Sequence, residues 1–419
     1  MQAMTINQDR LLERLLRYVQ IDTTAREEVD DYPSSAGQFE LGRLVAEELR
    51  AAGAVDVEQS KFGIVTATLP ASGERTAPVV ALCAHFDTSP ETSGKGCRPQ
   101  VLRDYDGQDI QLPGDDGRVV RVAECPELAE MVGRTLVTTD GTTLLGGDDK
   151  AGVAVIVETI AHLAENQDID HGTVRVCLTC DEEVGRGTDH IDLAALGADV
   201  CYTLDGQGQG ELDVETFSAD LATVRIEGVN IHPAIAKGKM VNAVRIAGDF
   251  LSRLPAAGLS PETTDGRDGF MHPYTIEGGV AEVTLRILLR DFDTAKLAEY
   301  ARILEETAHE VASSHAGSRI AVDVREQYRN MAAGLRDEPR AVGLAAEAYR
   351  RLGTEPKLTI VRGGTDGSKL TELGLPTPNL STGQHNIHSP LEWACLEEME
   401  FAVRHLVELL QLWAAEEKR

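Results

Sequence analysis

The sequence predicts a two-domain α/β protein, and three observations predict it. Short, uniformly apolar runs alternate with amphipathic helical segments, which is typical of a largely parallel sheet flanked by helices. Later segments alternate apolar and polar residues, which indicates an antiparallel sheet with one exposed face. The chain of 419 residues is also too long for one compact core.

The first domain is predicted to begin with two amphipathic helices. Apolar residues recur at helical spacing in 6–20 and in 38–52, and Gly53 follows the second segment as a stop signal. The apolar runs that follow favour strands buried on both faces, with one helix between them. The strands are expected at 79–84, 174–179 and 200–204, and the helix at 152–163.

The pattern changes after Gly210. Alternating segments at 211–217, 222–229 and 281–290 predict half-exposed antiparallel strands, and helical segments lie between and after them, at 240–254 and 294–314. We therefore expect an α+β domain with an antiparallel sheet, inserted into a discontinuous domain that ends in an amphipathic helix. The expected bounds are 216–328 for the inserted domain, 1–215 and 329–419 for the first domain, and 396–415 for the last helix.

Composition restricts the partners. The net charge of −29 excludes nucleic acid, because phosphate binding requires a basic patch. No apolar run approaches the ~18 residues of a membrane span, and no signal sequence opens the chain. Seven scattered cysteines fit reduced thiols in the cytoplasm, where we expect the protein to act. Cys177 and Cys180 have CxxC spacing, but no second pair follows at zinc-ribbon spacing.

Residues that can bind metal follow the apolar runs. At the ends of the three predicted strands, the side chains reach one edge of the sheet, where α/β proteins bind ligands. Two glycines bring backbone close to a further acid ahead of the predicted helix, and a histidine lies in a polar loop near the C-terminus. In chain order these residues are His85, Asp87, Asp148, Glu182, Glu183, Asp205 and His388.

Each of these signals has an ordinary structural explanation when taken alone. His85 could be a satisfied core histidine, Asp148 could be a helix N-cap, and His388 could be a surface residue. Adjacent acids such as Glu182 and Glu183 repel each other at a strand end unless a cation or solvent relieves them. Because uncompensated buried charge is costly, a pair of metal ions explains the whole set best, with the remaining carboxylate as a general base.

The same motifs resemble the peptidase T family of aminotripeptidases, within the two-zinc exopeptidase superfamily that also contains carboxypeptidase G and related deacylases. The resemblance runs nearly end to end. The Pro-Glu-Thr-Thr, Ala-Lys-Gly and Thr-Thr-Asp-Gly-Thr-Thr elements are the most particular to the family. The matching segments are 85–90, 138–146, 148–152, 181–185, 202–206, 231–233, 236–243, 260–264, 290–293 and 362–367.

The resemblance implies a role for each matching residue. One zinc ion would be bound by His85, Asp148 and Asp205. The other would be bound by Asp148, Glu183 and His388, with Asp148 as the bridge. Catalysis would use a zinc-bridged water as nucleophile, with Glu182 as general base and Asp87 orienting His85. On the inserted domain, which would close over the substrate, His232 would polarise the scissile carbonyl.

Two further residues, Asn242 and Arg362, would contact the peptide. The family's Asp148–Asp149 peptide bond is expected to be cis. Where the family has one histidine near the C-terminus this chain has two, His385 and His388, and the position favours His388 as the ligand.

The expected activity is thus removal of the N-terminal residue from free tripeptides. Alternatives are another hydrolase of the superfamily, such as a dipeptidase, a carboxypeptidase or an N-acyl amino acid deacylase, and a non-catalytic zinc-binding scaffold. Cobalt or manganese could replace zinc at such ligands. The expected partner is a small peptide substrate, without nucleic acid or membrane, and the sequence leaves homodimer formation open.

Overall fold

The computed structural model describes residues 4–73, 76–114 and 117–418, and the chain divides into two compact units. Unit 1 comprises Met1–Val214, Ala333–Thr359 and Thr365–Arg419. Unit 2 comprises Glu215–Ala332 and Ile360–Gly364. The inserted domain expected at 216–328 lies within unit 2. Unit 2 also includes residue 215, residues 329–332 and the short segment 360–364.

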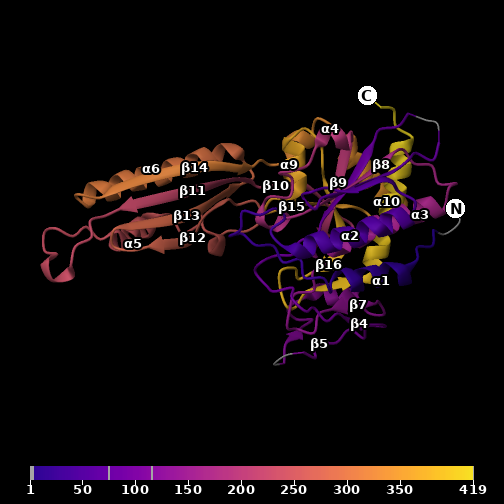
Figure 1. Cartoon of the computed structure of the whole chain (residues 1–419), viewed down its shortest axis with the longest axis horizontal. Helices are drawn as coiled ribbons and strands as arrows, with labels where there is room; N and C mark the ends of the chain where they lie inside the picture. Colours follow the sequence, from indigo (N-terminus) through magenta and orange to yellow (C-terminus); the bar gives the residue numbers. More distant parts are fainter. Residues whose placement is uncertain (1–3, 74–75, 115–116, 419) are drawn as a thin grey trace. The chain divides into compact units, whose positions relative to one another are not determined.

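A mixed β-sheet forms the centre of unit 1 (Figure 1). Its strands follow the order β1-β2-β8-β3-β9-β16-β17-β7-β4, and β10 pairs with β15 and β16. The adjacent strands β8, β3, β9 and β16 run parallel, and the strands around them are antiparallel. The predicted fold class is therefore confirmed. The strands are β1 (Val55–Gln59), β2 (Val65–Leu69), β3 (Val80–His85), β4 (Gln100–Leu102), β7 (Leu136–Thr138), β8 (Val174–Thr179), β9 (Val200–Gln207), β10 (Glu211–Thr216), β15 (Lys357–Val361), β16 (Asn379–His385) and β17 (Trp393–Cys395).

Helices cover both faces of this sheet, which is why its central strands are apolar throughout. Alternate residues of β3 point to opposite faces. Leu82 packs with Ile156 in the core that contains α3 and α10, whereas Cys83 packs with Leu196 and Leu370 on the other face. The α-helices other than the two that pack on the sheet of unit 2 are α1 (Gln8–Tyr18), α2 (Ala36–Ala51), α3 (Gly147–Glu165), α4 (Leu193–Leu196), α7 (Ala332–Leu335), α8 (Arg340–Arg351), α9 (Asp366–Glu372) and α10 (Leu396–Ala414).

A small lobe of unit 1 lies beside β7 and β4. It holds the hairpin of β5 (Ile110–Gln111) and β6 (Val119–Val120) and the 3-10 helix η1 (Pro126–Glu130). Its apolar residues form a separate cluster with Trp393 and Cys395 of β17. The lobe therefore packs against the strand that follows the loop of His388.

One strand prediction is wrong in its placement. The pattern groups the segment 211–217 with the antiparallel strands of the inserted domain, although the expected bounds leave 211–215 in the first domain. The residues Glu211–Thr216 form β10 of the large sheet. Leu212 pairs with Leu380, and Asp213 pairs with Asn379, both in β16. Alternation of apolar and polar residues predicts a strand with two unlike faces, and it does not identify the neighbouring strand.

Unit 2 is an antiparallel sheet with two helices on one face (Figure 1). Apolar residues of β11 and β13, such as Val224 and Leu285, pack against Phe250 of α5 and Leu304 of α6. The order β12-β13-β11-β14 includes two strands, β12 and β14, that the sequence pattern did not reveal. The elements are β11 (Ser218–Glu227), η3 (Pro233–Ile235), α5 (Ala243–Arg253), η4 (Pro261–Thr263), β12 (Phe270–Gly278), β13 (Glu282–Asp291), α6 (Thr294–Ser314) and β14 (Arg319–Tyr328).

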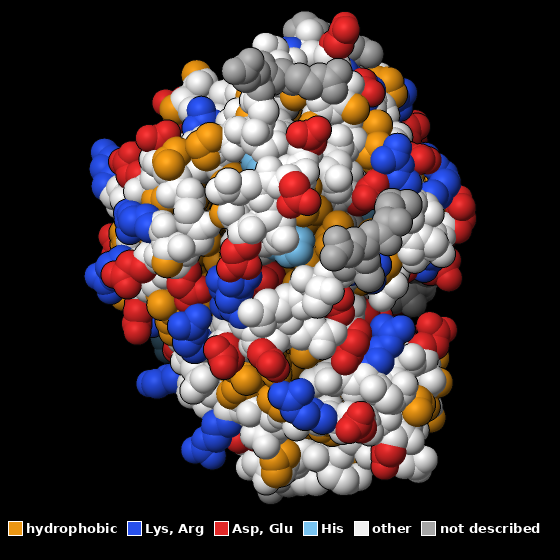
Figure 2. Space-filling model, turned by 90° about the vertical axis from the view of Figure 1, so that its right-hand side faces the viewer, with side chains coloured by type: hydrophobic (Ala, Val, Ile, Leu, Met, Phe, Trp, Pro, Cys, Tyr) orange, Lys and Arg blue, Asp and Glu red, His pale blue; other side chains and the backbone are white. Residues whose placement is uncertain are grey.

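The surface carries charges of both signs. Figure 2 shows a face on which acidic and basic side chains are interspersed among small hydrophobic patches. The excess negative charge is thus not gathered into one acidic patch on this face. Within the described ranges, no helix is long and apolar enough to cross a membrane.

Candidate metal centre

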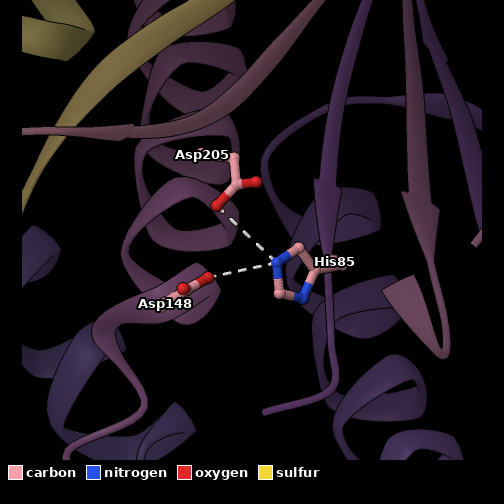
Figure 3. A group of neighbouring side chains, drawn as sticks. All are labelled: His85, Asp148 and Asp205. Atoms are coloured by element: carbon pink, nitrogen blue, oxygen red, sulfur yellow. Dashed lines mark ion pairs between the residues drawn. The ribbon is translucent and has the colours of Figure 1, made fainter. Parts of the chain in front are cut away.

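The first ligand group lies at the carboxyl ends of β3 and β9. His85 ends β3, and its Nε2 lies 3.1 Å from Asp148 Oδ1 and 3.7 Å from Asp205 Oδ1 (Figure 3). Asp148 comes from the N-terminus of α3, and Asp205 lies inside β9 rather than after it. Three ligand atoms from separate elements therefore converge, all within 4.8 Å of one another.

The second ligand group shares Asp148 with the first. His388 Nε2 lies 3.0 Å from Glu183 Oε2 and 3.3 Å from Asp148 Oδ2. The three ligand atoms again lie within 4.8 Å of one another. Because Asp148 presents one oxygen to each group, its carboxylate has the position of a bridge between two cations.

The chemistry of this donor set fits divalent cations. Burial, and after it the charge of Asp148, raise the pKa of Glu183 to about 8 and the pKa of Asp205 to about 7. Burial opposes ionisation of Asp148 too, but His388 and His85 bring its pKa below the usual range. Among the described residues, Glu183 Oε1 is buried without a hydrogen-bond partner. Carboxylates and imidazoles arranged in this way suit zinc and similar ions.

Asp87 holds the segment that contains Glu182. Its two carboxylate oxygens accept the backbone N–H groups of Glu182 at 3.1 Å and Glu183 at 3.0 Å. The ring Nδ1 of His85 lies 3.1 Å from the Asp87 carbonyl oxygen and 3.5 Å from its carboxylate. Asp87 therefore contacts both the ring of His85 and the backbone of the predicted base, whereas the sequence suggested only the first contact.

Glu182 is a carboxylate beside the two groups that belongs to neither. It begins the 3-10 helix η2 (Glu182–Val184) directly after β8 and Asp181. Burial raises its pKa well above the usual value, and His85 opposes this rise. A carboxylate with a raised pKa near a metal site is suited to accept and return a proton at neutral pH.

The turn before α3 is supported by Glu392, whose function the sequence did not reveal. Its buried carboxylate accepts the backbone N–H groups of Leu145, Gly146 and Asp148, at 2.8, 2.8 and 3.0 Å. Asp149 Oδ1 accepts the N–H of Gly152, and its Oδ2 accepts the N–H of His85. The helix cap is therefore Asp149, which leaves Asp148 free for the metal groups, and the Asp148–Asp149 bond is cis as the resemblance implied.

The two C-terminal histidines lie in different environments. His385 is buried in β16, where its Nε2 contacts Glu398 Oε2 at 2.7 Å and its ring stacks on Trp393 with centroids 3.8 Å apart. Only His388 lies with Asp148 and Glu183. His385 thus stabilises β16. The backbone of His388 is left-handed, with φ of 61°, and in this conformation its imidazole lies at the candidate metal centre.

The three predicted peptide contacts lie in unit 2. His232 and Asn242 are N-cap residues, and their side chains accept backbone N–H groups at the starts of η3 and α5. Arg362 donates to the carbonyls of Gly266 and Asp268 at 2.9 Å each, and its guanidinium lies over the ring of Phe217. Each therefore has a local structural role within unit 2, and contact with a peptide stays a prediction.

A central sheet with two candidate ligand groups that share one carboxylate is the arrangement expected of hydrolases with paired metal sites. Residues 139–412 match the profile of peptidase family M20/M25/M40. Two proteins named Peptidase T are each 42% identical to this chain. The one from Geobacillus kaustophilus (strain HTA426) aligns over 403 residues, 96% of this chain and 98% of its own. The one from Clostridium botulinum (strain Langeland / NCTC 10281 / Type F) aligns over 404 residues, 96% of this chain and 99% of its own.

Solved structures share the fold. Aminopeptidase PepT from Bacillus cereus ATCC 10987 superposes with a TM-score of 0.75 at 24% identity, covering 98% of this chain and 100% of its own. A tripeptidase from Staphylococcus aureus superposes with a TM-score of 0.77 at the same identity and coverage. The chain belongs to peptidase family M20/M25/M40, and it is a peptidase.

Proposed function

We propose that the chain is a two-zinc aminopeptidase that removes the N-terminal residue from free tripeptides. The observation that carries the proposal is the shared Asp148, which lies in both ligand groups. Full-length relatives named Peptidase T support the peptide substrate. A cytoplasmic location is part of the proposal, and seven free, buried cysteines support it.

Two groups of residues would hold the ions. His85, Asp148 and Asp205 would hold one, and Asp148, Glu183 and His388 the other. When bound, such ions supply Lewis acidity and lower the pKa of water toward neutrality. The carboxylates are then required in their ionised form, which the ions would favour.

Glu182 would do the proton chemistry. It is the one carboxylate of the adjacent acidic pair that is outside both ligand groups. In the proposal it takes a proton from the attacking water and gives it to the leaving amine. Asp87 would keep it in place through the two backbone N–H groups that it accepts.

Peptide binding would use residues of unit 2. His232 would polarise the scissile carbonyl, and Asn242 and Arg362 would contact the peptide backbone or its C-terminal carboxylate. The residues 216–328 would close over the substrate and exclude water. The family resemblance supports these assignments.

The test is a substrate screen on metal-stripped and zinc-reloaded protein. Trialanine should be cleaved faster than dialanine, N-acetylalanine or longer alanine peptides, and only after zinc is restored. Fastest turnover of N-acetylalanine would identify a deacylase, and fastest turnover of dialanine a dipeptidase. No turnover of any substrate by zinc-loaded protein would favour a scaffold.

A further inference from the structure

Asp181, the residue before the proposed base, has a left-handed backbone. Its φ is 61° and its ψ is 31°, and the residue is fully buried between β8 and η2. Most side chains avoid this conformation, and Asp and Asn tolerate it best. The direction in which the chain leaves β8 toward Glu182 therefore depends on what holds Asp181.

The carboxylate of Asp181 is enclosed by donors from Ser34, which precedes α2, and from Gln38 in its first turn. Ser34 donates its backbone N–H at 2.7 Å and its hydroxyl at 2.5 Å, and the amide nitrogen of Gln38 donates at 2.7 Å. Gln38 also accepts the backbone N–H of Asp181, at 3.0 Å. Backbone and side chain of the same residue are thus fixed to one helix.

Arg186 completes this enclosure. Its guanidinium donates to Asp181 Oδ2 at 2.8 Å and to the carbonyl oxygen of Val29 at 3.2 Å. Its backbone N–H donates to the Asp181 carbonyl at 2.9 Å. Because the charge of Asp181 is paired with Arg186, this acid adds little to the negative charge of the metal centre. The ion pair with Arg186 indicates that Asp181 fixes the position of the backbone and does not add charge to the metal centre.

On the other side of the turn, Asp87 accepts the next two backbone N–H groups, those of Glu182 and Glu183. Three consecutive backbone N–H groups, from residues 181 to 183, are therefore bound by side chains from two different elements. We infer that Asp181 is a positioning residue that aims the Glu182 carboxylate through Ser34, Gln38 and Arg186. The inference rests on the proposed function, in which Glu182 is the base.

The first variant is Asp181→Asn, which keeps the tolerance for the left-handed backbone but places an amide where donors converge. We expect kcat to fall ~10- to 100-fold, the range for a displaced catalytic group. KM and the two metal ions per chain should stay unchanged. Glu48→Gln is the matched control, because Glu48 lies on the same helix α2 and accepts from Arg14 and Tyr18 instead. It should lower the melting temperature and leave kcat unchanged.

A double-mutant cycle with Glu182→Gln decides the question. If Asp181 acts through Glu182, adding Asp181→Asn to Glu182→Gln should not lower kcat further. Additive losses, or loss of metal from Asp181→Asn, would overturn the inference. Near wild-type kcat in Glu182→Gln alone would instead overturn the proposed function. Ser34→Ala removes the hydroxyl that donates to Asp181 and accepts the backbone N–H of Arg26, and it serves in the same cycle should Asp181→Asn not fold.

Discussion

Glu182 is one of two adjacent acids, and the structure separates their surroundings. Glu183 lies with a histidine and the shared aspartate, whereas Glu182 is outside both ligand groups. Glu182→Gln keeps the shape of the side chain and removes its ability to accept a proton. We expect kcat to fall at least ~10²-fold. Metal analysis should still give two ions per chain, and a loss of metal would mean that Glu182 is a ligand rather than a base.

The two C-terminal histidines offer a matched pair of variants. His388→Ala removes a ligand and should reduce bound metal from two ions to one, with loss of activity. His385→Ala should keep both ions but lower the melting temperature, because it removes the contact with Glu398 and the stack on Trp393. Metal content by mass spectrometry checks both variants. The reverse pattern would exchange the roles of the two residues.

The buried strands could be predicted from the sequence, but the order of the strands in the sheet could not. The buried runs of β3 and β8 were predictable because helices cover both faces of the sheet, which leaves no polar positions. The placement of β10 was not, because its pairing with β16 depends on residues about 170 positions away. The class of the fold therefore followed from local pattern, and the neighbours of individual strands did not.

The same distinction holds for the site. Six of the seven acids and histidines were visible because they follow a predicted strand or a glycine pair, and His388 was visible as a histidine in a polar loop. The residues that support them were not. Glu392 holds the turn before α3, and Asn379 accepts the backbone N–H of Asp205, each from a distant segment. No spacing in the sequence predicts such contacts, because only tertiary packing creates them.

Arg362 links separate segments of unit 2, so its removal should loosen the packing between those segments. It donates to the loop 264–268 and lies over Phe217 and Phe270. Arg362→Ala should therefore speed amide hydrogen exchange in 264–270. If Arg362 also holds the peptide carboxylate, kcat/KM should fall more for a tripeptide than for an amino-acid amide. Equal losses on both substrates would leave Arg362 with its structural role alone.

The metal centre makes the stability of the whole molecule depend on pH. Without metal, Glu183 and Asp205 have pKa values of about 8 and about 7, and the pKa of His388 is about 11. For the carboxylates the cause is burial, whereas for His388 contacts with Asp148 and Glu183 outweigh burial. In each case the folded state holds a proton that the unfolded state has lost, so stability falls as pH rises.

We therefore expect the melting temperature of the metal-free protein to decrease between about pH 5 and pH 9, which lies within the interval of about pH 4 to 11 between the unfolded and the folded pKa values. Bound metal replaces these protons, so the increase in melting temperature on adding zinc should grow over the same interval. Calorimetry at several pH values measures both trends. The opposite slope in metal-free protein would contradict the environments described for these groups.

The position of β16 in the large sheet has a consequence for biosynthesis. This strand lies between β9 and β17 in the sheet, yet it is encoded at residues 379–385, after all of unit 2. The ligands His85, Asp148 and Asp205 leave the ribosome well before His388 does. Until His388 has been made, a nascent chain can thus assemble one ligand group at most, and a product that ends before His388 cannot carry a complete pair of metal sites.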